Sequence, residues 1–240
     1  MPIQTVEPQR LYRQIAEQLR QLMASGEFAV GSRLPAERDL AVQLGVSRPS
    51  VREALIALEV EGMIEVRTGS GIYVQSTTAA TRPPAHTASD TSIEWGPLEV
   101  MSARILVESE VAALAAQNAQ KQNIQAIRNG LEKMKQEAAR HEMPREGDEA
   151  FHEAIAQACG NSVLHDTVQR FWIARKGPLF ARLGDYFEHP ASWQAAIAEH
   201  QAVLDAIEAG DANAARKAMQ RHLKQAHKRY SASWRRAPAR

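Results

Sequence analysis

Residues 34–74 read LPAERDLAVQLGVSRPSVREALIALEVEGMIEVRTGSGIYV, and this stretch decides the fold of the N-terminal part of the chain. Pro35 suits the first turn of a short helix, because its ring fixes φ near the helical value. Gly45 breaks that helix, and Ser47 then has a side chain of the kind that caps the next one. Gly62 stops this second helix. The stretch therefore opens with two helices joined by a short turn.

Apolar residues on both sides of this helix pair complete a small domain. Upstream, leucine and isoleucine recur at helical spacing and predict a helix over about residues 8–25. Downstream, apolar and polar residues alternate on either side of Thr68-Gly69-Ser70-Gly71, which predicts a two-stranded hairpin. A helix, a helix-turn-helix and a two-stranded ribbon in this order form a winged helix-turn-helix, which we expect to span residues 1–75. The residues of the two patterns are Leu11, Ile15, Leu19 and Leu22 in the helix and Ile64, Val66, Ile72 and Val74 in the hairpin.

The same stretch resembles the DNA-binding domain of the GntR family over about forty continuous residues. The shared motifs are the arginine after Pro-Ala-Glu, the Val-Ser-Arg turn, the Val-Arg-Glu-Ala-Leu helix and the glycines of the hairpin tip. The resemblance implies that the second helix of the pair enters the major groove of double-stranded operator DNA, while the wing tip enters the minor groove. The positions to which it assigns DNA contact are Arg38, Arg48, Pro49, Ser50, Arg52 and Gly69.

The placement of the arginines carries this prediction, because the segment has no excess of positive charge. Residues 1–75 contain eight arginines, no lysine and nine acids. Arg48 and Arg52 occur at the N-terminal end of the predicted recognition helix, on faces that its apolar residues do not use. A guanidinium there can bond O6 and N7 of guanine together. Ser47 and Ser50 can reach phosphate or base edges at the same helix terminus. The alternative is that these arginines are solvated surface residues.

The rest of the chain is predicted to be a helical domain behind a linker. Residues 76–94 are rich in Thr, Ala, Ser and Pro and lack apolar periodicity. Over residues 95–235 one helical pattern follows another without a strand signal, which predicts an antiparallel helical bundle and a mainly α chain. No apolar run reaches the length of a membrane span, the N-terminus does not resemble a signal peptide, and Cys159 is the only cysteine. We therefore expect a cytoplasmic protein without disulfides.

Three histidines and one aspartate of the helical half have the chemistry of a metal site. Asp148 and His152 are four residues apart and share one helix face. His200 and His222 lie among apolar residues of the last two predicted helices. Three imidazoles and one carboxylate would suit a divalent transition metal, with water or a ligand completing the shell. Spacing alone does not show that the four converge, and each histidine by itself also fits a core or surface role.

The helical half resembles the FCD ligand-binding domain of the FadR branch of GntR regulators. In metal-binding members of that branch, one Asp and three His at the matching positions bind the metal. The resemblance thus implies a divalent transition metal, with zinc favoured over nickel or manganese, at Asp148, His152, His200 and His222. The motifs that carry the resemblance are Arg104…Glu108, Asp148-x-x-Phe151-His152, Gly160-Asn161, His200 and His222.

The same resemblance implies a small carboxylate effector beside the metal. Arg104 matches the carboxylate-holding arginine of relatives, and a guanidinium pairs with a carboxylate through two hydrogen bonds. The alternative for Arg104 is an ion pair with Glu108, one helical turn away. Asn161 and Arg175 are weaker candidates for the effector site, since Asn161 could equally cap a helix.

One stretch narrows the resemblance further. Residues 151–180, FHEAIAQACGNSVLHDTVQRFWIARKGPLF, together with the Trp193-x6-His200 spacing, resemble hexuronate-responsive regulators. The expected protein is a homodimeric, effector-responsive regulator, a repressor of a carbohydrate or organic-acid catabolic operon. Alternatives are a regulator that senses another small acid such as lactate or citrate, a helical scaffold with a structural metal, and a metal-dependent hydrolase. We do not expect an enzyme, because the chain has no HExxH motif, nucleophile elbow or phosphate loop.

Overall fold

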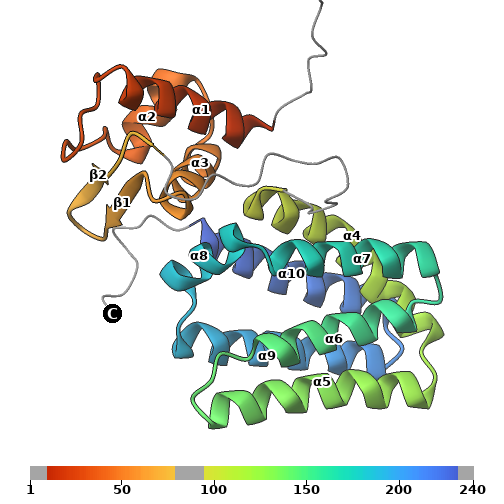
Figure 1. Ribbon diagram of the computed structural model, residues 1–240. Coiled ribbons are helices and arrows are strands. Elements are labelled where there is room, and N and C mark those ends of the chain that lie inside the picture. The colour runs from red at the N-terminus through yellow and green to blue at the C-terminus, as the bar shows by residue number, and fades with distance from the viewer. Residues whose placement is uncertain (1–9, 79–94, 232–240) are drawn as a thin grey trace, which may run out of the picture. The chain divides into compact units, whose positions relative to one another are not determined.

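The structure, a computed structural model, describes residues 10–78 and 95–231 (Figure 1). Within these residues the chain forms two compact units, one that ends at Gly96 and one that starts at Pro97. The expected linker over residues 76–94 lies for the most part outside the described residues, as does the end of the expected helical domain after residue 231. No helix in the described part combines the length and apolar character needed to cross a membrane.

The N-terminal unit has the winged helix-turn-helix architecture that the sequence predicts. The first and third helices pack on one another, and the two strands pair antiparallel with Ile64 opposite Val74. Gly45 takes a left-handed conformation with φ 65°, which lets the chain turn sharply between the second and third helices. The elements are α1 (Leu11–Ala24), α2 (Glu37–Leu44), α3 (Arg48–Val60), β1 (Ile64–Arg67) and β2 (Gly71–Val74).

The start of each helix in the helix-turn-helix has a local cause. Ser47 is the N-cap of α3, and its hydroxyl oxygen accepts a hydrogen bond from the Ser50 backbone N–H at 3.3 Å, as expected. α2 begins at Glu37, two residues later than Pro35, because Ala36 is still extended with ψ 150°. The recognition helix α3 is thus fixed at its N-terminal end, where the predicted contacts occur.

The second unit is all α, in agreement with the predicted bundle. α4 packs along α10, α5 along α6, and α9 contacts both α5 and α10. Figure 1 shows α5 and α6 side by side, with α9 next to them. The helices are α4 (Pro97–Asn118), α5 (Lys121–Ala139), α6 (Arg145–Ala158), α7 (Ser162–Arg175), α8 (Pro178–Phe187), α9 (Pro190–Glu208) and α10 (Ala212–Tyr230).

Two glycines allow α5 and α6 to approach closely. A Cβ at Gly130 would lie 2.7 Å from the Phe151 backbone, and one at Gly147 would overlap the Met134 backbone nitrogen. Only a residue without a side chain fits at either position. This contact fixes the start of α6, the helix that carries Asp148.

Helix α8 was not anticipated from the sequence. Pro178 lies in its first turn, and Phe180, Leu183 and Phe187 are buried along one face. Those are the features of a short amphipathic helix, so the sequence did contain the pattern. α8 matters for function because Phe187 and the residue after it, Glu188, line the cavity described below.

Candidate metal centre and DNA-binding surface

A hollow on the N-terminal unit is lined by arginines from four parts of the chain. Arg38 comes from α2, Arg48 from the start of α3, and Arg67 from the wing, with the Gly69 tip beside them. Arg33 completes the ring, and its guanidinium lies over Gly71 so closely that a Cβ there would overlap it. The structure therefore brings the predicted Arg38, Arg48 and Gly69 together and adds two arginines that the sequence analysis did not select.

The serines and the proline of the predicted contact set lie at the N-terminus of α3. Ser47 is exposed and Ser50 is half-buried, and their hydroxyl oxygens are 2.8 Å apart. Pro49 is in the first turn, where a missing N–H costs no helical hydrogen bond. Exposed hydroxyls at a helix N-terminus are well placed for phosphate.

Arg52 differs from the sequence prediction, which placed it on an accessible face of α3. The residue is 1% exposed, and its Nε and NH2 atoms each donate to Glu37 at 2.9 Å. Residues Val51 to Leu58 are all buried, so α3 has no open face at this point. Glu37 also accepts from Arg48 Nε at 3.0 Å, and Arg48 remains 49% exposed. The Arg48 side chain is therefore accessible from solvent, whereas the Arg52 side chain is enclosed within the unit.

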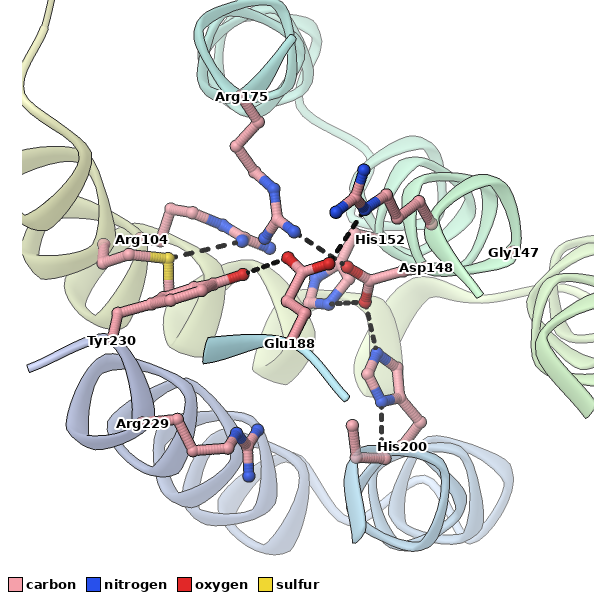
Figure 2. Close-up of polar contacts among 12 residues, drawn as sticks. Arg104, Gly147, Asp148, His152, Arg175, Glu188, His200, Arg229 and Tyr230 are labelled. Carbon is pink, nitrogen blue, oxygen red and sulfur yellow. Dashed lines mark hydrogen bonds and ion pairs between the residues drawn. The ribbon is translucent and has the colours of Figure 1, made fainter. Parts of the chain in front are cut away.

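In the helical unit, the four predicted metal ligands meet in one buried cluster. Asp148 and His152 come from α6, His200 from α9 and His222 from α10. Each can offer one ligand atom, and these atoms all lie within 4.8 Å of one another. Figure 2 shows the Asp148 carboxylate between the rings of His152 and His200. His200 Nε2 is 2.9 Å from Asp148 Oδ1, and His152 Nε2 is 3.6 Å from it.

Each imidazole is held through its Nδ1 by an acceptor outside the cluster. His152 Nδ1 lies 2.5 Å from Glu108 Oε2, and His200 Nδ1 lies 2.7 Å from the Ala196 carbonyl oxygen. His222 Nδ1 lies 2.8 Å from a Glu199 carboxylate oxygen. A proton on Nδ1 leaves Nε2 as the lone-pair atom.

The protonation states suit cation binding. Burial and the neighbouring His200 lower the pKa of His222 to about 3, and burial also lowers the pKa of His152. Despite its burial, the contacts of Asp148 with His200 and Arg175 hold the pKa of this carboxyl well below its usual range. His152 Nε2 is buried without a hydrogen-bond partner. The neutral imidazoles of His152 and His222, an ionised carboxylate and an unsatisfied Nε2 fit a transition-metal ion.

A cavity opens beside this cluster. Arg104, Arg175 and Arg229 line it together with two of the candidate ligands, Asp148 and His222. Its volume is about 40 Å³, which is room for roughly three water molecules. The remaining lining residues include Glu188, Ser192, Trp193 and Tyr230.

The predicted effector residues have different environments. Arg175 lines the cavity, and its NH2 atom is 3.3 Å from Asp148 Oδ2 (Figure 2). Arg104 also lines the cavity but forms the alternative ion pair, with its Nε 2.5 Å from Glu108 Oε1. Asn161 does not line the cavity: it is the N-cap of α7, and its side-chain oxygen accepts from Val163 and Leu164. The structure therefore gives no support to an effector role for Asn161.

Several cavity residues were missed by the sequence analysis. Arg229 and Tyr230 lie seven and eight residues after His222, so helical spacing already places them on its face of α10. Glu199 precedes His200 and binds both His222 and Arg229, and these hydrogen bonds lower the pKa of Glu199 to about 2 although burial opposes them. Glu188 accepts from the Tyr230 hydroxyl at 2.6 Å (Figure 2).

Comparisons with known proteins cover both units. The model of the bacterial regulatory protein family gntR matches residues 11–74, and the FCD domain model matches residues 99–225. The chain is 37% identical to the Exu regulon transcriptional regulator of Escherichia coli K12, with 92% of this chain and 84% of that protein covered. It is 35% identical to the Uxu operon transcriptional regulator and to the putative L-lactate dehydrogenase operon regulatory protein of the same organism, with 92% and 87% covered in each case.

Proposed function

This chain belongs to the gntR family of bacterial regulatory proteins and has an FCD domain, and from this starting point we propose that it represses a sugar-acid catabolic operon and responds to a small acid at a metal site. As a member of this family it is a DNA-binding transcription regulator and not an enzyme. Its place of action is then the bacterial cytoplasm, where operator DNA lies.

The observation that best supports the metal site is the orientation of three imidazoles around one carboxylate. Glu108, the Ala196 carbonyl and Glu199 hold the three Nδ1 atoms, which leaves each Nε2 as the lone-pair atom toward Asp148. We infer that Asp148, His152, His200 and His222 hold zinc, with nickel and manganese as alternatives. Four protein ligands would fill a tetrahedral shell, so the metal would bind an oxygen of an acid by expanding to five or six ligands.

The lining of the cavity supports an anionic, hydroxyl-bearing effector. Arg175 and Arg229 supply the charge that a carboxylate requires. Trp193 lines the cavity, and its indole N–H is buried without a hydrogen-bond partner, so it could donate to a hydroxyl oxygen of a ligand. Glu188 and Ser192 offer oxygens that could accept from ligand hydroxyls.

Hexuronates and the acids formed from them fit this combination of groups. The resemblance of residues 151–180 to hexuronate-responsive regulators supports the same assignment, and two relatives are named for the Exu regulon and the Uxu operon. The relative named for an L-lactate dehydrogenase operon keeps lactate and similar acids as the second candidate. A sugar acid is larger than three water molecules, so its binding requires the side chains that line the cavity to move.

The output of the regulator is the winged helix. We infer that Arg38, Arg48, Ser47, Pro49, Ser50 and Gly69 contact the operator, with Arg52 behind them. A homodimer would bind two half-sites related by its two-fold axis. Effector binding would favour a dimer in which the recognition helices no longer match neighbouring grooves, which lowers operator affinity and relieves repression.

Calorimetric titration of the zinc-loaded protein with D-glucuronate, D-galacturonate, L-lactate and citrate tests the effector site. We expect a hexuronate to bind wild type and to lose binding in Asp148→Asn, which removes a ligand charge. Asp205→Asn is the matched control, because Asp205 is exposed on α9 and its carboxylate accepts from the Gln201 side chain, outside the metal cluster. Binding of lactate or citrate alone would replace the hexuronate assignment, and equal hexuronate binding by the Asp148→Asn variant would refute the metal-linked site.

A further inference from the structure

Two arginines of the cavity are each connected to a different metal-ligand histidine through a glutamate. We call each of these arginine–glutamate–histidine chains a relay. In the first relay, Arg104 pairs with Glu108, and Glu108 accepts from His152 Nδ1. In the second, Arg229 donates to both oxygens of Glu199, NH1 to Oε1 at 3.0 Å and NH2 to Oε2 at 3.2 Å. Glu199 Oε2 in turn accepts from His222 Nδ1 at 2.8 Å.

The two relays differ in accessibility. Arg104, Glu108 and His152 are each 2% exposed or less, although Arg104 lines the cavity. In the second relay, Arg229 is 26% exposed and Glu199 18% exposed. Arg229 also lines the cavity that includes His222. The arginine of the second relay is therefore the more accessible of the two to a bound anion.

Binding of an anion to Arg229 would change the strength of the hydrogen bond between Glu199 and His222 Nδ1. A carboxylate shared between a guanidinium and an imidazole divides its charge between two donors. When an anionic ligand takes the guanidinium, the carboxylate accepts more strongly from the Nδ1–H that remains. A stronger acceptor at Nδ1 raises the basicity of Nε2 and with it the affinity for a metal.

We propose that Glu199 couples the cavity to the metal centre, so that an anionic effector that recruits Arg229 strengthens metal binding at His222. The inference rests on the proposed metal site and effector cavity. Because coupling between two ligands is reciprocal, the bound metal strengthens effector binding by the same factor. Glu199 is a positioning residue in this scheme, and it need not touch either ligand.

Zinc affinity, measured by competition with a chromogenic chelator, tests the relay without any effector. Glu199→Gln removes the charged acceptor and should weaken zinc binding by roughly tenfold or more. Arg229→Gln imitates the recruited state and should tighten zinc binding by about fivefold or more. Arg216→Gln is the control, because Arg216 on α10 forms a similar two-point pair with Glu110 on the surface, away from any histidine of the cluster; its zinc affinity should equal that of wild type.

The double variant Glu199→Gln/Arg229→Gln separates a relay from simple loss of positive charge. In the relay, the effect of Arg229→Gln disappears when Glu199 is replaced. If Arg229→Gln tightens zinc equally in both backgrounds, or weakens zinc in wild type, the proposal is overturned. Addition of D-glucuronate gives an independent result: it should tighten zinc binding less in Arg229→Gln than in wild type, because only the direct contact between the acid and the metal remains. The variants can show the expected zinc affinities while no hexuronate changes the zinc affinity of wild type. That result would refute the hexuronate assignment and support the relay.

Discussion

Arg52 and Glu37 form a two-point ion pair inside the winged-helix unit, with both N···O distances at 2.9 Å and the arginine 1% exposed. Removing one partner of such a pair leaves the other charge buried and uncompensated. We expect Arg52→Ala to cost about 3–5 kcal/mol of unfolding free energy. Denaturant unfolding, followed by circular dichroism, measures this loss.

Arg48→Ala is the contrasting variant, because Arg48 bonds to the same glutamate but is half exposed. It should cost at most about 1 kcal/mol of stability and about 1–3 kcal/mol of operator affinity. Arg38→Ala, at a residue whose side chain is 78% exposed and pairs with its half-exposed neighbour Asp39, should leave stability unchanged. If Arg52→Ala is as stable as wild type and loses only operator affinity, then Arg52 contacts the DNA, and its ion pair with Glu37 does not stabilise the fold.

Arg33 should contribute to operator binding although no sequence motif selected it. It lies in the same hollow as Arg38, Arg48 and Arg67, next to the wing. An arginine that contacts phosphate releases a counterion, so Arg33→Ala should weaken operator binding and reduce the slope of log K against log salt by about one. Fluorescence anisotropy at several salt concentrations measures both. An unchanged slope would show that Arg33 only supports the wing through its contact with Gly71.

Gly147 should be essential for the position of Asp148. A Cβ there would overlap the Met134 backbone on α5, and backbone atoms cannot move aside as a side chain can. We expect Gly147→Ala to destabilise the protein by about 1–3 kcal/mol and to weaken zinc binding, because α6 is pushed away from α5. Gly184→Ala is the control, since the atoms nearest to its Cβ would be the ends of the Arg145 and Glu188 side chains, which can move. Equal stability of the two variants would contradict the tight contact between α5 and α6.

Trp193 should discriminate effectors through its indole N–H. Trp193→Phe keeps an aromatic ring but removes the unpartnered donor on the cavity. Loss of one neutral hydrogen bond should weaken hexuronate binding by roughly 2- to 10-fold, with zinc affinity unchanged. Calorimetry on the zinc-loaded variant measures the first quantity and chelator competition the second. Equal affinity of both proteins for hexuronate would mean that the ligand does not use this donor.

Local sequence features predicted the elements of the fold, because each has a local cause. Ser47 caps α3, Gly45 turns the chain before it, and Pro97 starts α4 as expected. The spacing of Asp148 and His152 predicted one shared helix face. The convergence of these two residues with His200 and His222 depends on how α6, α9 and α10 pack, and residue spacing does not contain that information. The resemblance to FCD domains was the one sequence feature that predicted it.

The residues that sequence reasoning misplaced or missed owe their environment to tertiary contacts. Arg52 follows Val51 on α3, and no local pattern indicates that Glu37 encloses it from α2. Glu199 has the appearance of an ordinary surface acid before His200, and its role depends on Arg229, thirty residues later. Arg104 was expected to hold an effector, and its closest partner is Glu108.

The central claim is that a small acid bound at the metal site controls the affinity of the protein for its operator. The measurement that tests it most directly is operator affinity, by anisotropy on a genomic fragment selected by the protein itself, with and without hexuronate. The account predicts that D-glucuronate or D-galacturonate lowers the affinity of the zinc-loaded protein by about fivefold or more, and that a chelator or Asp148→Asn abolishes this response. Operator affinity that no hexuronate changes, or a response that persists without metal, would contradict it.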